Sequence, residues 1–316
     1  MRKLVLSLVL VVSAFFLGSC GSVQAAASLA QQVSLGGIVN LPAGTITLDC
    51  SSQFSIARGT IVQGQGRGVT IINDVCPSGN TFTVDLSAPG TAVKIQDLTV
   101  THNTATGTVL SISGSGGKQS PAPTVVVSSV DFSQAQNCIV TTGLNLFFLE
   151  KSIVRGCGGD GANINSFGVT LHDNWFEFNQ GNGVSFVGSG FCASCFGNEY
   201  NSNAGHGFIY NNSDGADGRH TNEYVDSNGD VGVVVHGARD FTFNNGWVGS
   251  NRGGGMVIGD TEIGTSLVGN TFTNNFGPNL IVEQRSSPLR LSGNLSSNPH
   301  DPCDSEINGR CTSMNQ

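Results

Sequence analysis

The segment NEYNSNAGHGFIY, residues 198–210, contains the repeat that decides the fold. Gly207 opens a turn-then-strand unit, Gly207-Phe-Ile-Tyr210, and similar units recur every 22 to 25 residues. The units begin at Gly161, Gly183, Gly207, Gly232, Gly255 and Asn279. A second series in the same phase comprises Asn179, Asn203, Asn228, Asn251 and Asn275. Two signals that share one period over several copies indicate a repeat architecture.

Each repeat contains short apolar runs, such as residues 169–171, 175–178 and 184–186. Runs this short need neighbours with which to pair, and the unit leaves no room for strand–helix–strand crossovers. We therefore expect each run to stack on its equivalent in the next coil. The predicted fold is all-β, a single-domain right-handed parallel β-helix of roughly ten coils.

The period also predicts which side chains point inward. We expect the core to include Val184, Phe186, Phe208, Tyr210, Val233 and Val235. The repeated asparagines should form a ladder of amides along the axis. An aromatic residue precedes each of them, at Phe176, Tyr200, Tyr224, Trp247 and Phe272. We expect core or ladder packing for Trp175 and Trp247, with sugar stacking as the alternative.

The composition supports a globular β protein. The chain of 316 residues has 44 glycines, 38% hydrophobic residues and only 11% charged residues. Glycine-rich, regularly spaced apolar runs suit tightly turned strands and leave enough apolar residues for a core. The net charge of −8 argues against a nucleic-acid partner, because phosphates require a basic surface.

The N-terminus has the pattern of an export signal. Arg2 and Lys3 precede an apolar run, residues 4–17, which is too short for a conventional membrane span. Leu17-Gly18-Ser19-Cys20 resembles a bacterial lipobox, which implies acylation of Cys20 and a membrane anchor. Ordinary cleavage near residues 23–27 is the alternative. We expect an outer-membrane or cell-surface lipoprotein, or otherwise a secreted or periplasmic protein.

Four segments follow from these patterns. They are a signal peptide (1–20), a linker and N-terminal cap (21–37), the β-helix (38–297) and a disulfide-closed tail (298–316). Eight cysteines remain after cleavage, an even number that suggests disulfides in an oxidising compartment. Proximity in the repeat suggests four pairs: Cys50–Cys76, Cys138–Cys157, Cys192–Cys195 and Cys303–Cys311. No histidine lies at ligand spacing beside Cys192 and Cys195, so the sequence favours a disulfide over a zinc site there.

Two early segments resemble a known superfamily. Val39-Asn-Leu-Pro-Ala-Gly-Thr-Ile-Thr-Leu48 and Thr60-Ile-Val-Gln-Gly-Gln-Gly-Arg-Gly-Val69 resemble consecutive turns of pectate lyase-like β-helix proteins. That superfamily includes polysaccharide lyases, glycoside hydrolases, esterases, epimerases, phage tailspikes and adhesins. The resemblance implies a polysaccharide or other glycan partner, but it does not identify a reaction.

Family-specific catalytic motifs are incomplete. Gly205-His206-Gly207 is similar to the histidine motif of polygalacturonases, and Asp160 resembles their first aspartate segment. Gly181-Asn182 replaces the expected aspartate pair, so the acid–base pair that hydrolysis requires is missing. No aspartate cluster of the kind that binds calcium in pectate lyases is present, although calcium remains possible. Asn298-Pro-His300-Asp301 resembles the mannuronan epimerase motif but differs at its first residue.

Polar residues gather instead in the turns of residues 214–262. The outward loop is predicted to carry Asp214, Asp217, Arg219, His220 and Glu223. The candidate catalytic residues are Asp217, Arg219, His220, His236 and Asp260, because Arg or His beside carboxylates can serve as base and acid. The candidate substrate-binding residues are Asp160, His206, Arg239, Asp240 and Glu262. Glu283 and Arg285 follow in the next turn.

The sequence thus predicts an exported β-helix that engages polysaccharide. A polysaccharide lyase or glycoside hydrolase is one interpretation. A non-catalytic glycan-binding, adhesin-like or structural envelope protein is the alternative. The missing motifs favour the second, and the polar turns favour the first.

Overall fold

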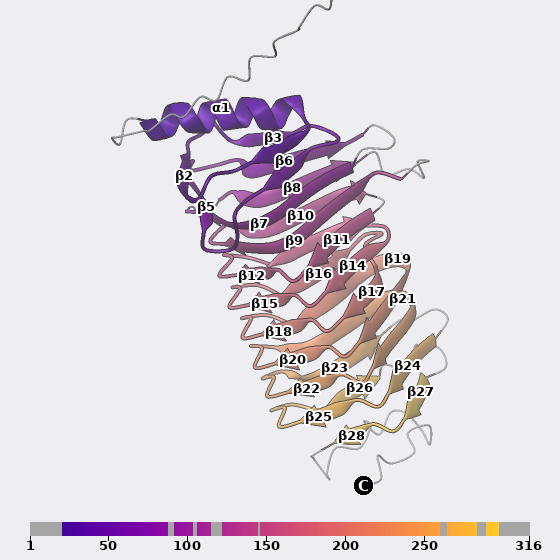
Figure 1. The fold of residues 1–316 in the computed structure, drawn as a ribbon. Coiled ribbons are helices and arrows are strands. Elements are labelled where there is room, and N and C mark those ends of the chain that lie inside the picture. Colours follow the sequence, from indigo (N-terminus) through magenta and orange to yellow (C-terminus); the bar gives the residue numbers. More distant parts are fainter. Residues whose placement is uncertain are drawn as a thin grey trace, which may run out of the picture.

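The protein is a β-helix of about ten coils in a computed structural model (Figure 1). The structure describes residues 21–87, 92–103, 106–114, 122–144, 146–259, 264–282 and 289–296. All strand pairings between successive coils in this part of the chain are parallel. The predicted all-β, single-domain parallel β-helix is confirmed. The predicted signal peptide, Cys20 and the disulfide-closed tail lie outside the described residues.

The coils build three faces of one continuous parallel sheet. Face A comprises β1 (Ile38–Asn40), β4 (Ile61–Gln63), the first parts of β7 (Ala92–His102) and β9 (Thr124–Ser133), β11 (Leu146–Glu150), β14 (Val169–His172), β17 (Cys192–Phe196), the last parts of β19 (Phe208–Thr221) and β21 (Val231–Asn244), β24 (Gly264–Val268) and β27 (Leu289–Ser292). Face B comprises β2 (Gly44–Leu48), β5 (Thr70–Asp74), the last parts of β7 and β9, β12 (Ile153–Arg155), β15 (Trp175–Glu177), β18 (Glu199–Asn201), β20 (Tyr224–Asp226), β22 (Trp247–Gly249), β25 (Thr271–Thr273) and β28 (Leu295–Ser296). Face C comprises β3 (Phe54–Ile56), β6 (Asn80–Leu86), β8 (Thr108–Gly114), β10 (Asn137–Leu144), β13 (Ala162–Ser166), β16 (Val184–Val187), the first parts of β19 and β21, β23 (Gly254–Gly259) and β26 (Leu280–Val282).

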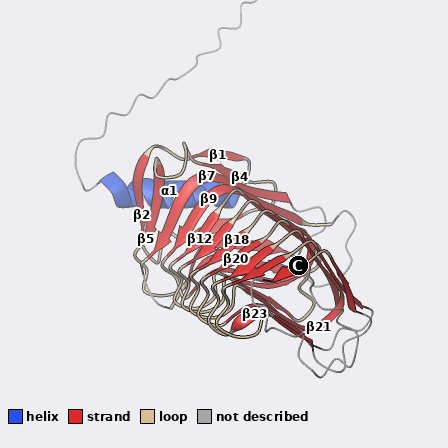
Figure 2. Ribbon diagram, turned by 90° about the horizontal axis from the view of Figure 1, so that it is seen from below, coloured by secondary structure: helices blue, strands red, loops and turns tan. Residues whose placement is uncertain are grey.

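The predicted asparagine ladder follows face B. Asn179 Nδ2 donates to Asn203 Oδ1 over 2.8 Å, and the same bond repeats through Asn228, Asn251 and Asn275. Each turn bends at the residue before the asparagine, which has a left-handed φ near +56° at Phe178, Ser202, Ser227, Ser250 and Asn274. The tan turns beside β12, β18 and β20 repeat regularly in Figure 2.

A second ladder of asparagines, which was not predicted from the sequence, precedes face B. Asn174 bonds to Asn198, and Asn270 bonds to Asn294, each over 2.9 Å. Glu223 and Gly246 occupy the two positions between these pairs. Asn198 donates to the Glu223 carboxylate from both its backbone and its side chain. The second ladder is therefore interrupted on two consecutive coils.

The core forms as the period predicts, with one correction. All six predicted inward residues, Val184, Phe186, Phe208, Tyr210, Val233 and Val235, are fully buried. The upstream aromatics, however, belong to two columns. Phe176 and Tyr200 pair inside, whereas Tyr224 and Trp247 are offset by one position and pair outside. A one-residue offset reverses the face of a strand side chain, so the prediction of core packing is wrong for Trp175, which is 50% exposed.

Helix α1 (Gly21–Leu35) covers the N-terminal end of the β-helix (Figure 1). Its residues Ala26 and Val33 are fully buried against the first coils. Three of the expected disulfides are present: Cys50–Cys76, Cys138–Cys157 and Cys192–Cys195. No helix within the described ranges is long and apolar enough to span a membrane.

Candidate functional site

The described residues of the predicted cluster lie on two neighbouring strands, β19 and β21. Asp217 is the register partner of Asp240, and both are half-buried. Arg219 and Arg239 are exposed, and His236 is half-buried opposite Asn211. We name Asp217, Arg219, His236, Arg239 and Asp240 the corner cluster. Asp260, Glu262, Glu283, Arg285 and the side chain of Asp214 lie outside the described residues.

Two members of the predicted outward loop point into the core instead. Residues 217–221 continue strand β19 rather than forming a loop, and His220 and Glu223 are 0% and 2% exposed. Strand alternation explains this result, because Arg219 faces outward and His220 must then face inward. The prediction that His220 and Glu223 lie in an outward loop is therefore wrong, and the catalytic role of His220 stays a prediction.

Asp160 and His206 lie in a row of turn residues. Asp160 Oδ1 accepts a hydrogen bond from the Asn182 backbone over 2.8 Å, and Asn182 Oδ1 accepts one from the His206 backbone over 2.8 Å. Asp160 Oδ2 also accepts from Ser185 Oγ. His206 Nδ1 lies 3.1 Å from the Val231 carbonyl oxygen, and Nε2 lies 4.0 Å from Asp230 Oδ2. These groups tie consecutive turns together, and a substrate contact there stays a prediction.

A different surface combines aromatic and acidic side chains on the outside of face B. Its members occupy the first and third positions of β15, β18, β20 and β22, which point away from the core. We name this surface the aromatic–carboxylate face. It comprises Trp175, Glu177, Glu199, Tyr224, Asp226 and Trp247. Successive coils present these positions ~4.8 Å apart along the axis.

The aromatic part of this face is ordered by stacking. The rings of Tyr224 and Trp247 lie 4.5 Å apart at 6° to one another. Gly249 makes this possible, because a Cβ there would come within 2.3 Å of the Trp247 ring. Trp175 and Tyr224 are 50% and 40% exposed. Exposed, ordered aromatic rings of this kind are suited to packing against the apolar side of a ligand.

The acidic part lies beside these rings. Asn201 Nδ2 donates to Glu199 Oε1 over 2.7 Å, and Asn201 is the register partner of Glu177. Partial burial is the largest cause of the raised pKa of Glu177; Glu199 and Asp131 also raise it, and Arg155 opposes them. Arg155 itself forms a two-bond ion pair with Asp131, of 2.7 and 3.2 Å. Two neighbouring carboxyls, one of them more easily protonated, could act as acid and base.

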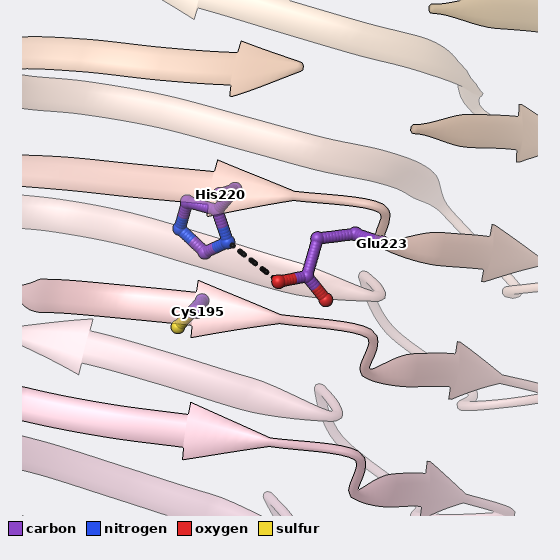
Figure 3. Close-up of side chains that lie close together, drawn as sticks. All are labelled: Cys195, His220 and Glu223. Atoms are coloured by element: carbon purple, nitrogen blue, oxygen red, sulfur yellow. Dashed lines mark ion pairs between the residues drawn. The ribbon is translucent and has the colours of Figure 1, made fainter. Parts of the chain in front are cut away.

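Inside the same coils lies a group of buried polar side chains (Figure 3). Cys195 on β17 and His220 on β19 are register partners, and Glu223 follows at the next turn. Their ligand atoms lie within 4.8 Å of one another. His220 Nε2 lies 2.8 Å from the Tyr210 hydroxyl, and Nδ1 lies 3.6 Å from Glu223 Oε1. We name Cys192, Cys195, His220 and Glu223 the core polar group.

Burial controls the charge of this group. It lowers the pKa of His220 to about 3 and is the main cause of the raised pKa of Glu223. Both shifts favour the neutral form, as expected for ionisable groups removed from water. His220 stacks on Phe208 at 4.5 Å and 8°, so a polar ring replaces an apolar one in the core.

Neither group was predicted as a site from the sequence, for a shared reason. The aromatic–carboxylate face assembles residues that lie about one coil apart in the sequence. An offset of one residue decides whether a side chain belongs to this face or to the core. The core polar group joins Cys195 to a histidine 25 positions later, whereas the search for a metal site considered only local ligand spacing. Aligning the repeats column by column would have exposed Cys195 and His220 as polar breaks in a column of leucine and phenylalanine.

Comparisons with known proteins support the fold. No family model and no curated protein matches the sequence. The structure is similar to the A-module of the Azotobacter vinelandii mannuronan C-5 epimerase AlgE4, with a TM-score of 0.64, 17% identity, and coverage of 87% of this chain and 91% of that one. The AlgE6 A-module of the same organism is similar too, with a TM-score of 0.57 and 19% identity; the match covers 88% of this chain and 94% of that one.

A third similar structure is the enzymatically active domain of tailspike protein 2 from bacteriophage CBA120. The TM-score is 0.58 at 13% identity, with 87% of this chain and 40% of that chain covered. The segment that resembles the epimerase motif, residues 298–301, lies outside the described residues. At these identities the likeness concerns architecture alone. The chain has the right-handed parallel β-helix fold of these proteins.

Proposed function

We propose that this protein is an exported polysaccharide-binding β-helix and that the aromatic–carboxylate face holds the glycan. The observation that carries the proposal is the outward column of Trp175, Glu199, Tyr224 and Trp247, in which Tyr224 and Trp247 stack, with Glu177 and Asp226 two positions further along their strands. The apolar side of a sugar ring can pack against the aromatic rings. Its hydroxyl groups can donate hydrogen bonds to the carboxylates.

The repeat suits an elongated ligand. Because equivalent positions recur ~4.8 Å apart, a polymer lying along the axis would contact several coils at once. The charge of the face selects among polymers. Arg155 is paired with Asp131, so the carboxylates would repel a uronate polymer. We therefore favour a neutral polysaccharide, with an acidic polymer bridged by calcium as the alternative that the experiment separates.

Export is part of the proposal. Three disulfides in the described chain are consistent with an oxidising compartment. The lipobox-like segment supports a lipid anchor at Cys20 on the outer membrane or cell surface. Ordinary secretion remains the competing placement. Incorporation of labelled palmitate that is lost in Cys20→Ser would support the anchor, and equal labelling of both proteins would contradict it.

A second function, glycoside hydrolysis, is favoured by one observation. Glu177 has a raised pKa, and Glu199, two positions before the register partner of Glu177 on the adjacent coil, contributes to that shift. Glu177 would protonate the leaving oxygen, and Glu199 would act as base or nucleophile. The corner cluster is the competing catalytic location, where Asp217 or Asp240 would supply the carboxylates and Arg219 or His236 the other proton-transfer group.

The test is a panel of neutral and acidic polysaccharides, with and without calcium. It measures retention in affinity electrophoresis, new reducing ends and unsaturated products. We expect Trp247→Ala and Tyr224→Ala to weaken retention about tenfold or more. Phe276→Ala, an 81% exposed aromatic off this face, is the matched control. Wild-type retention in both face variants would refute the proposed surface.

The same panel separates binding from catalysis. Reducing ends that vanish in Glu177→Gln and Glu199→Gln, with retention kept, would support hydrolysis on the aromatic–carboxylate face. Loss of the reducing ends in Asp217→Asn or Arg219→Ala instead would support catalysis at the corner cluster. Retention without any product would support the non-catalytic function.

A further inference from the structure

The core polar group interrupts a column that is otherwise apolar. Leu149, Leu171, Phe243, Leu267 and Leu291 occupy the equivalent inward positions on face A. Cys195 and His220 stand between them on adjacent coils. Buried polar groups are costly unless they are satisfied, so a histidine at the centre of this column, beside a disulfide-bonded cysteine, requires an explanation.

Hydrogen bonding satisfies the group only in part. Glu223 accepts two bonds from Asn198, and His220 Nε2 pairs with Tyr210. His220 Nδ1 is fully buried, points toward Glu223 and has no hydrogen-bond partner. The Tyr200 hydroxyl is also buried without a partner. An unsatisfied imidazole nitrogen beside a sulfur and a carboxylate is a typical arrangement of metal ligands.

We propose that Cys192, Cys195, His220 and Glu223 form a latent zinc site, which the Cys192–Cys195 disulfide masks and its reduction opens. The two cysteines have the C-x-x-C spacing of zinc sites. The Cys195 sulfur lies beside His220 and Glu223, and the disulfide joins the Cys192 sulfur to it. The missing histidine of the sequence analysis comes from the next coil.

The chemistry balances with a dithiol as the reductant. It transfers two electrons and two protons to the disulfide, which yields two cysteine thiols and the oxidised, disulfide form of the reductant. Zinc binding then releases the thiol protons and the proton of Glu223, if it is held. Two thiolates, one neutral imidazole and one carboxylate give the complex a net charge of −1. A Cys₃His site, a common structural zinc site, carries the same charge.

The surroundings fit such a complex. Metal-bound histidines usually donate the other ring N–H to an oxygen, and Tyr210 lies 2.8 Å from Nε2. The Asn198 amide would orient Glu223 in the same way. The ligand atoms of Cys195, His220 and Glu223, which lie within 4.8 Å of one another, and the Cys192 sulfur would have to close toward bond lengths of ~2.0–2.3 Å from the metal. Because the site is buried, the metal would enter while these coils fold.

The test refolds the full mature chain with Co²⁺ or Zn²⁺, once fully oxidised and once with a phosphine. The phosphine replaces the dithiol because it brings no thiolate of its own; it takes oxygen from water to become the phosphine oxide, and the two protons of that water go to the two cysteine thiols. Reduced wild type should bind one additional metal equivalent and show thiolate-to-cobalt charge-transfer absorption, which the oxidised protein should lack. Cys192→Ser/Cys195→Ser is the matched control, because it keeps every other cysteine. It should lose the absorption.

Two variants separate this site from adventitious thiol binding. His220→Phe retains an aromatic ring in the column, as at Phe243, and should lower cobalt affinity about 10- to 100-fold. Glu223→Gln should lower it by a similar factor. Absorption unchanged in His220→Phe, or present in the double serine variant, would overturn the proposal. Absence of the absorption from reduced wild type, whether or not its β-sheet circular dichroism survives, would overturn it too.

Discussion

The inner and outer aromatic columns of face B are offset by one residue along the chain. This offset places the inner column in the core and the outer column on the surface. Phe176 and Tyr200 stack inside at 5.3 Å and are fully buried. Tyr224 and Trp247 stack outside at 4.5 Å, with Tyr224 40% exposed. The inner pair is needed to fill the core, whereas the outer pair adds exposed rings that the fold does not require. The comparison therefore separates residues that maintain the β-helix from residues available for a ligand.

Truncating one member of each column on the same strand should have very different effects on stability. Phe176→Ala should lower the free energy of unfolding by about 3–5 kcal/mol, because it leaves a cavity in a closely packed core. Trp175→Ala should change it by less than about 1 kcal/mol, because half of the ring already contacts water. Chemical denaturation of both variants measures the difference. Equal losses would contradict the assignment of the two columns.

The ladder extends the comparison to polar residues. Asn203 accepts two hydrogen bonds from Asn179 and donates to Asn228 and to the Phe176 carbonyl oxygen. Asn203→Ala should therefore cost about 2–4 kcal/mol, because several buried partners lose their bonds. Asn211→Ala, at an exposed position of the same coil, is the control and should change stability by about 0.5 kcal/mol or less. Chemical denaturation measures both effects, as shifts of the unfolding midpoint at an unchanged dependence of stability on denaturant concentration.

Burial of His220 makes the stability of the fold depend on pH. Burial lowers the pKa of His220 from its ordinary value of 6.5 to about 3 in the folded protein, so between these values the unfolded chain binds a proton that the folded chain does not. Stability from this group falls as the pH drops below 6.5, by up to about 1.4 kcal/mol per pH unit. Glu223, with its raised pKa, acts oppositely, since its contribution falls as the pH rises above 4.5.

The experiment therefore compares His220→Phe/Glu223→Gln with Glu223→Gln alone. The double variant should gain stability relative to the single variant as the pH falls from 6.5 to 4.5. The difference should stay constant above about pH 7.5, which provides the internal control. A difference that does not change down to pH 4.5 would show that His220 is not held neutral by burial.

The repeat predicts the fold well because three kinds of position share one period. Gly207, Asn203 and Tyr210 each recur at one period, so turn, ladder and core positions agree. The candidate sites were harder to predict. Tyr224 and Trp247 follow the period only approximately, and one residue decides whether an aromatic ring is inside or outside. His220 is ambiguous for the same reason, because the outward loop expected there is a strand whose side chains alternate.

The central claim is that the outer column holds a polysaccharide, and the chain offers a direct reporter. It contains two tryptophans, Trp175 and Trp247, and both belong to the aromatic–carboxylate face. Titration with the polysaccharide retained in the panel should produce a saturable change in tryptophan emission, with Trp175→Phe and Trp247→Phe reporting each ring separately. Unchanged emission while an independent assay shows binding, or no binding to any polysaccharide, would contradict the claim.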